Sequence, residues 1–277
     1  NGRIFDTTLD PTNTYLFAAT SHGVSVYNID PASLIGRENN PLNPDDLLDF
    51  IDENGDGVDD RIIVNVALPQ GYAGIGIDGY FERFNDRVFV TGAKLDSKQN
   101  IIPQTSALFV LSFDSVDITN TTVVEQLSLP GNLVRGIDVQ NNRTLVALGD
   151  EGLGVIDSYL HTKQYLSEQL KLPNDHQALD LAVIPTAVDQ ASLFAVAAGH
   201  YSFKDNKLLD ETDNTTGGMY IVERNADEGL RIIGAIDVPT SSVKVKGNYI
   251  FAASGSNGTI IIDISNPAKP NIVNRIN

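Results

Sequence analysis

Five short apolar segments recur along the chain, and this repetition limits the folds that are open to it. Each segment is a run of β-branched, aromatic or small apolar residues that ends at a small residue. The segments are residues 15–20, 87–92, 144–149, 193–199 and 249–254. Runs of this length and composition predict strands buried on both faces, because helices need longer segments.

Each of these segments belongs to a longer unit of four strands. A turn and a second strand ending in an acidic residue follow it, and four of the five second strands open with a glycine suited to positive φ, namely Gly23, Gly152, Gly218 and Gly258. A further strand then runs to a proline, at Pro69, Pro130, Pro173 or Pro239. One more alternating stretch precedes each segment, so the unit has four strands and, insertions aside, a period of roughly forty residues.

Four-stranded units of this period predict an all-β fold, a β-propeller of about five blades in a single domain. One blade cannot bury both of its faces alone, so neighbouring blades must cover them. The predicted blades span about 1–70, 71–131, 132–173, 174–239 and 240–277. A right-handed β-helix is the alternative, although it needs shorter and more uniform coils. No blade is shared between the two ends, so either five blades close by packing alone or further blades lie outside this chain.

The last unit carries a family resemblance. Residues 247–270 have a Gly-Asn-Tyr start, an Ile-Ile-Asp strand end and an Asn-Pro-x-x-Pro turn, and they resemble the LVIVD repeat of bacterial and archaeal extracytoplasmic propellers. Units two to four keep only the strand cores and the proline, and unit one departs furthest. The resemblance implies a propeller built into a large surface or secreted protein, usually without known enzymatic activity.

A calcium site is predicted within the first unit, at residues 52–60. Side-chain oxygens stand at positions 1, 3, 5 and 9 of this stretch, Gly57 stands at position 6, and a backbone carbonyl is available at position 7. Calcium takes six to eight oxygen ligands, and such alternation turns every second residue toward the ion. The alternative is an acidic, glycine-rich turn that binds nothing.

The loop differs from a helical EF-hand, which needs a bidentate Glu at position 12. That position is Ile63, and a strand is predicted directly after the loop, at 61–66. The stretch resembles the nine-residue calcium loops of FG-GAP repeats in integrin-type propellers. That resemblance implies as ligands Asp52, Asn54, Asp56, the Val58 carbonyl and Asp60, with Asp59 facing solvent. Such a site would be structural and filled outside the cell, where calcium modules bind at about 10⁻⁴–10⁻³ M.

The charge and composition of the chain limit the partners and the cellular locations that we expect for it. The chain has a formal net charge of −17 and no cysteine. The charge disfavours nucleic acid as a partner, and no apolar run is long enough to insert into a membrane. The chain begins at an asparagine rather than methionine, so we expect a processed chain or a piece of a larger protein with other domains. With the LVIVD resemblance, this predicts an extracellular, cell-surface or periplasmic location.

Motifs for catalysis are absent from the sequence. The four histidines show no paired spacing for zinc, and neither a nucleophile elbow nor a phosphate loop is present. The sequence therefore favours a non-enzymatic adhesion, binding or scaffold module. The alternative is a carbohydrate-active enzyme, a glycosidase or lyase, whose carboxylates line the central channel. Asp78, Asp138 and Asp180 are the candidates for that role, because each lies near a predicted inner strand.

A partner surface is predicted where the longest hairpin connections and the blade tops share one face. The two longest connections are residues 93–106 and 200–217. Aromatic residues and arginine are enriched in recognition surfaces. The predicted partner-binding residues are Tyr72, Arg135, His176, His200, Tyr201 and Phe203. A protein or a polysaccharide is the expected ligand, and the alternative is that Tyr201 and Phe203 only pack within their own loop.

Overall fold

A computed structural model describes most of the chain. The described residues are 3–30, 55, 60–81, 86–113, 117–140, 143–159, 163–186, 193–200, 202–204, 207–209, 217–225 and 227–276. Within this part of the chain no helix has the length and apolar character needed to cross a membrane.

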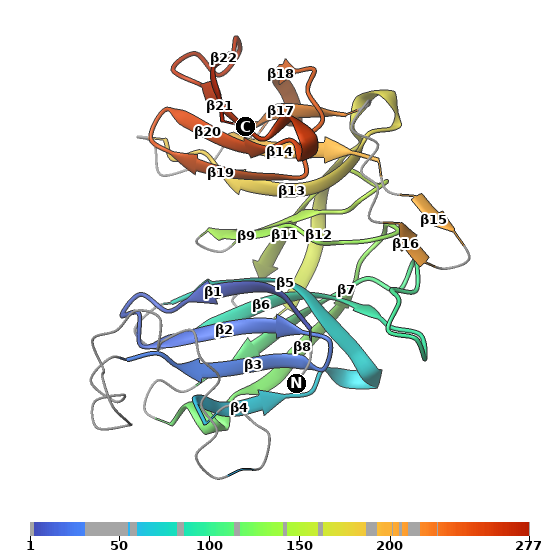
Figure 1. The fold of residues 1–277 in the computed structure, drawn as a ribbon, viewed down its shortest axis with the longest axis vertical. Helices are drawn as coiled ribbons and strands as arrows, with labels where there is room; N and C mark the ends of the chain where they lie inside the picture. Colours follow the sequence, from blue (N-terminus) through green and yellow to red (C-terminus); the bar gives the residue numbers. More distant parts are fainter. Residues whose placement is uncertain are drawn as a thin grey trace.

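The chain forms five four-stranded antiparallel sheets, each built from strands in sequence order with the first strand innermost (Figure 1). Blade 1 contains β1 (Ile4–Leu9), β2 (Tyr15–Thr20), β3 (Gly23–Asn28) and β4 (Ile62–Val66). Blade 2 contains β5 (Tyr72–Tyr80), β6 (Arg87–Lys94), β7 (Ala107–Ser112) and β8 (Thr122–Ser128). Blade 3 contains β9 (Ile137–Gln140), β10 (Arg143–Ala147), β11 (Leu153–Tyr159) and β12 (Lys163–Leu170).

The last two blades follow the same plan, with one insertion. Blade 4 contains β13 (Gln177–Val183), β14 (Leu193–Gly199), β17 (Gly218–Asn225) and β18 (Gly229–Ile236). Between β14 and β17 lies a separate hairpin of β15 (Ser202–Lys204) and β16 (Lys207–Leu209). Blade 5 contains β19 (Ser242–Lys246), β20 (Tyr249–Ala253), β21 (Thr259–Asp263) and β22 (Asn271–Ile276). Four 3-10 helices complete the described structure: η1 (Pro69–Gly71), η2 (Ile118–Asn120), η3 (Pro173–Asp175) and η4 (Gly255–Asn257).

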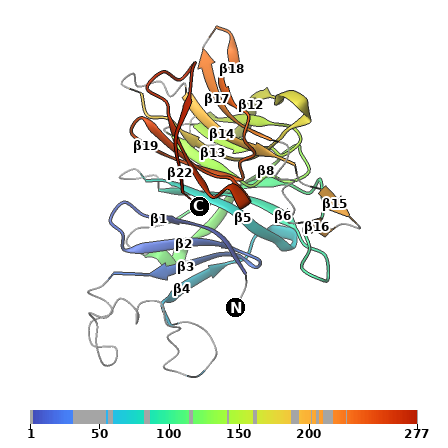
Figure 2. The same cartoon turned by 45° about the horizontal axis from the view of Figure 1, so that its top comes forward.

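The predicted fold class, an all-β propeller of five four-stranded blades, is therefore confirmed. The inner strands contact one another in the series β1, β5, β9, β13 and β19. Blades 1 and 5 lie at opposite ends of this series, with blade 3 between them (Figures 1 and 2).

Apolar layers between successive blades form the core. Phe17 and Val26 of blade 1 pack in one cluster with Phe109 of blade 2, and a comparable cluster joins each later pair of blades. The second strands supply fully buried residues in the first four blades, as predicted from their composition. Blade 5 differs from that prediction. In β20 buried residues alternate with exposed ones, so only one face of this strand is covered.

The hairpin glycines are confirmed in three units and displaced in one. Gly23, Gly152 and Gly258 have φ values of +124°, +81° and +71°. A Cβ on Gly23 would lie 2.2 Å from the carbonyl oxygen of Val66, so a side chain has no room there. In blade 4 the positive φ, +150°, belongs to Gly217 rather than to the predicted Gly218. The residue with positive φ is thus one position earlier in blade 4 than the repeat pattern indicates.

Candidate functional site: the central channel

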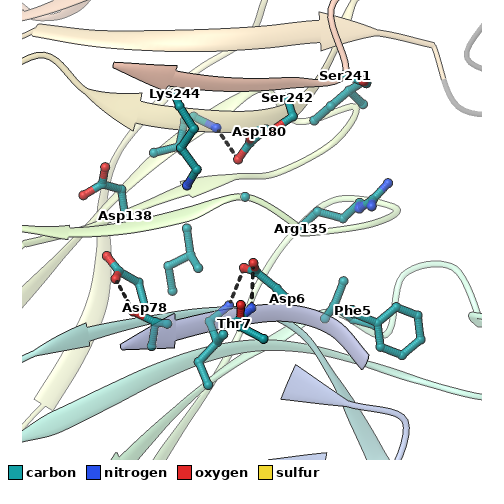
Figure 3. Close-up of a pocket in the computed structure, with 17 residues that line it drawn as sticks. Phe5, Asp6, Thr7, Asp78, Arg135, Asp138, Asp180, Ser241, Ser242 and Lys244 are labelled. Carbon is teal, nitrogen blue, oxygen red and sulfur yellow. Dashed lines mark hydrogen bonds between the residues drawn. The ribbon is translucent and has the colours of Figure 1, made fainter. Parts of the chain in front are cut away.

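A polar channel runs between the five inner strands. Its cavity has a volume of about 460 Å³ and receives residues from every blade (Figure 3). Its charged lining consists of the carboxylates of Asp6, Asp78, Asp138 and Asp180 and the cations of Arg135 and Lys244. Hydroxyl groups from Thr7, Thr8, Ser241 and Ser242 also line it. The carboxylates outnumber the cations, so the channel has a net negative charge.

Two of the carboxylates occupy one register position. Asp6 is paired across its blade with Ala19, and Asp180 with Ala197, each beside a register shift in the inner strand. Asp6 accepts a hydrogen bond of 3.0 Å from the backbone N–H of Ile77 in blade 2. Asp180 accepts one of 3.0 Å from the backbone N–H of Val243 in blade 5, and a second from the hydroxyl of Ser242.

The other two carboxylates lie two positions further along their inner strands. Asp78 is paired with Phe89 and Asp138 with Leu145. Asp78 accepts a hydrogen bond of 2.7 Å from the backbone N–H of Val139 in blade 3. It also accepts one of 3.3 Å from the hydroxyl of Thr8 in blade 1.

A third hydrogen bond of this kind links the inner strands of blades 3 and 4. Asp138 accepts a hydrogen bond of 2.9 Å from the backbone N–H of Val183. Each of the first four blades thus places one Asp on a backbone N–H of the following inner strand. We name these contacts the inter-blade carboxylate bonds: Asp6–Ile77, Asp78–Val139, Asp138–Val183 and Asp180–Val243.

The inter-blade carboxylate bonds supply acceptors for backbone N–H groups of the inner strands. The first strand of a blade is the edge of its sheet, so it carries N–H groups with no partner within the sheet. A buried unpaired N–H is costly, and a carboxylate is a stronger acceptor than a neutral group. The channel carboxylates therefore bind neighbouring blades together and satisfy the edges that form the channel wall.

Blade 5 interrupts this series. The register equivalents of the Asp positions in β19 are Ser242, paired with Ala253, and Lys244, paired with Phe251. The ammonium group of Lys244 lies close enough to Asp6, Asp78 and Asp138 to lower their pKa values. Figure 3 shows its side chain extending into the channel between the inner strands that carry these carboxylates.

Burial sets the protonation behaviour of the channel. Loss of hydration raises the pKa of Asp6 and of Asp78 above the ordinary value, although the hydrogen bonds that each accepts oppose this. Burial raises the pKa of Asp138 to about 6, against the lowering effect of the Val183 N–H, and the negative charge of Asp78 adds to the increase. The protonation of Asp138 therefore changes close to neutral pH.

The three carboxylates proposed from the sequence, Asp78, Asp138 and Asp180, lie together in this channel. Asp6 and Lys244 also line the channel but were not predicted from the sequence. The sequence holds a signal for Asp6, because Phe5-Asp6 and Leu179-Asp180 are both an apolar residue followed by an Asp in the first strand of a unit. Lys244 had no such signal, since its role depends on which blades face one another across the channel.

The predicted calcium loop falls largely outside the described residues. Asp52, Asn54, Asp56 and Val58 are not among them. Gly55 is described and has a φ of +74°, and Asp60 is half-buried and lies two residues before β4. The strand predicted after the loop is present as β4.

Two of the residues predicted to contact a partner are buried in the structure. Tyr72 is 8% exposed, packs edge-on against Phe109 with ring centroids 5.0 Å apart, and lies under the ammonium group of Lys94. His176 is also 8% exposed. These two residues can support a binding surface but offer little area to it.

The remaining predicted contacts are dispersed. Arg135 lines the channel. The ring of His200 meets that of His176 edge-on, with centroids 5.5 Å apart, and His176 Nδ1 lies 2.7 Å from the Tyr220 hydroxyl. Burial and the neighbouring His200 lower the pKa of His176. Tyr201 lies outside the described residues, as does the side chain of Phe203 in β15.

Comparison with known proteins agrees with this architecture. Residues 239–277 match the LVIVD repeat. This match covers blade 5 and a small part of the chain, as the sequence resemblance indicated. No curated protein matches the sequence.

Solved structures match over the whole chain. Raptor from Chaetomium thermophilum superposes with a TM-score of 0.63 at 9% identity, over 100% of this chain and 21% of its own. The Cps50 (Swd1) β-propeller domain from Myceliophteria thermophila gives 0.57 at 8% identity, over 100% of this chain and 72% of its own. The chain thus spans about a fifth of the Raptor chain. At these identities the likeness concerns the fold alone.

Proposed function

We propose that this chain is a non-enzymatic binding or scaffold module of a secreted or surface protein, stabilised by calcium at 52–60. The observation that carries the proposal is the set of inter-blade carboxylate bonds. Each channel Asp accepts a hydrogen bond from a backbone N–H of the next blade, which gives these carboxylates the role of joining successive blades. A propeller organised in this way offers its loops and outer surfaces to a protein or polysaccharide partner.

The calcium part of the proposal rests on the spacing of Asp52, Asn54, Asp56, Val58 and Asp60. Five oxygen ligands in one loop, three of them carboxylates, suit a hard cation. The bound ion would tie the long connection between β3 and β4 to the start of β4. An extracellular location follows from the low affinity expected for such a site, because cytosolic calcium would leave it largely empty.

A carbohydrate-active enzyme is the second candidate, and Asp138 is the observation that favours it. A glycosidase needs a carboxylic acid with a raised pKa to protonate the leaving group. The pKa of Asp138, about 6, meets that requirement, and the channel holds other carboxylates. The inter-blade carboxylate bonds weigh against it, since they occupy one oxygen of every channel Asp.

One experiment separates the two candidates. The purified chain is presented to immobilised glycans and to surface proteins, and both retention and glycan cleavage are measured. We expect retention without cleavage, unchanged in Asp138→Asn and reduced at least tenfold by deletion of residues 201–216. Cleavage that Asp138→Asn abolishes would instead establish the enzyme. Retention unaffected by the deletion would reject the predicted partner surface.

A further inference from the structure

Blade 5 has an exposed apolar face. In blades 1 to 4 the equivalent face packs against the next blade in the chain. Tyr249 and Phe251 on β20 are 44% and 37% exposed, and Ile276 on β22 is 54% exposed. Ile261, paired with Phe251 on the neighbouring strand, is partly exposed. We name these four residues the open face.

The same positions are covered in blade 1. Its strand β2 reads Tyr-Leu-Phe-Ala-Ala-Thr and β20 with its next residue reads Tyr-Ile-Phe-Ala-Ala-Ser, so Phe17 is the counterpart of Phe251. Phe17 pairs with Val26 as Phe251 pairs with Ile261. Phe17 is fully buried, and its ring lies 5.1 Å from that of Phe113 in blade 2.

The other three blades repeat the pattern of blade 1. The counterparts of Phe17 in blades 2, 3 and 4 are Phe89, Leu145 and Ala195, and they are 7%, 2% and 0% exposed. In every case a following blade covers the residue. Only at Phe251 does this position open to solvent among the described residues, because none of the five described blades packs on that face.

Blade 1 does not cover the open face. Successive inner strands contact one another from β1 to β19, but no comparable contact joins β19 back to β1 in the described part of the chain. Half of the eight large apolar side chains that are exposed there belong to blade 5, so unburied apolar surface is concentrated at this end of the series. Apolar patches of this kind mark interaction sites.

We propose that the open face binds another four-stranded blade, supplied by a further repeat unit of the same polypeptide. The interface would continue the four blade–blade interfaces already present, with Phe251 in the place that Phe17 has between blades 1 and 2. The occupant is inferred from this continuity, because the open face repeats the side that blades 1 to 4 each cover with a following blade of the same chain. In β19 the two register positions that carry Asp in other blades hold Ser242 and Lys244. The interface between blade 5 and the further blade would therefore depend on apolar packing and not on an inter-blade carboxylate bond.

The test compares two polypeptides, the 277-residue chain and the natural polypeptide in which its source produces it. Phe17→Asp is the matched control, since it places a charge at the equivalent buried position. We expect Phe17→Asp to lower the melting temperature of both polypeptides by about 5 °C or more. Phe251→Asp should do so only in the natural polypeptide, and an unchanged melting temperature there would overturn the proposal.

Hydroxyl-radical footprinting of the unmodified proteins gives a second measurement that needs no variant. Tyr249 and Phe251 should be oxidised at least fivefold more slowly in the natural polypeptide than in the 277-residue chain. Equal oxidation overturns the proposal. Protection that appears in the 277-residue chain as its concentration rises would assign the open face to a second copy and reject a blade of the same polypeptide.

Discussion

The carboxylate of Asp138 in blade 3 accepts a hydrogen bond of 2.9 Å from the backbone N–H of Val183 in blade 4. The two residues are far apart in sequence, and each belongs to an edge strand that its own sheet cannot complete. Three further Asp residues make the equivalent contact in other blades. The channel of this propeller is therefore held together by the carboxylates that line it.

Removal of the Asp138 carboxylate should destabilise the fold. Asp138→Ala leaves the Val183 N–H without an acceptor, and we expect the free energy of unfolding to fall by about 1–3 kcal/mol. Asp138→Asn keeps an acceptor oxygen, so it should lower the free energy of unfolding by less than Asp138→Ala does. Urea denaturation at pH 7 measures both. Asp227→Ala, at an exposed residue, is the control and should change stability by less than about 0.5 kcal/mol.

Stability should respond to pH through the same residue. The pKa of Asp138 is about 6 in the folded chain and close to the ordinary 3.8 when unfolded, so the folded state binds more protons between these values. The contribution of Asp138 is therefore complete below about pH 4 and is lost as the pH rises through about 6. Asp138→Asn should gain stability relative to the unsubstituted chain over that interval. A pH-independent difference between the two proteins would contradict the assignment.

Lys244 should moderate the repulsion among the channel carboxylates. Lys244→Met removes the positive charge near Asp6, Asp78 and Asp138, so the pKa of Asp138 should rise further and stability at pH 7 should fall. Carboxyl chemical shifts followed by NMR titration measure the first effect. Lys246→Met is the matched control on the same strand, and it should leave the Asp138 titration unchanged because Lys246 does not line the channel. Equal effects of the two variants would show that Lys244 has no special position.

Calcium should raise the melting temperature of the chain. Chelation should lower it by several degrees, because a ligand bound only to the folded state stabilises that state. The double variant Asp52→Ala with Asp60→Ala should abolish this response, whereas Asp59→Ala should keep it. Differential scanning calorimetry with and without millimolar calcium makes the comparison. Identical melting temperatures for the unsubstituted chain in the two conditions would exclude the site.

The sequence predicts the blades because their strands are local and repetitive. Segments such as Tyr15–Thr20 and Leu193–Gly199 appear as strands at the predicted residues. The channel could be predicted in part, since Asp78, Asp138 and Asp180 were chosen for lying near predicted inner strands and all three line it. The approach of Lys244 to Asp6 could not be predicted, because it depends on the curvature of the whole series of blades.

Whether both faces of a strand are buried also could not be predicted from the sequence. Phe17 and Phe251 occupy nearly identical motifs, yet one is buried and the other exposed. Their difference lies in whether a described blade packs on that face of the strand, which the local sequence does not determine. Similarly, Tyr72 is of a residue type that is common in recognition surfaces, but it packs under Lys94 and against Phe109.

Amide hydrogen exchange at Val183 tests the central claim, that channel carboxylates join the blades, most directly. In the unsubstituted chain this edge-strand amide should be protected as well as the amides within the sheets. Asp138→Ala should accelerate its exchange at least tenfold, while Asp138→Asn should leave it close to the unsubstituted rate. Rapid exchange in the unsubstituted chain, or equal rates in all three proteins, would contradict the claim.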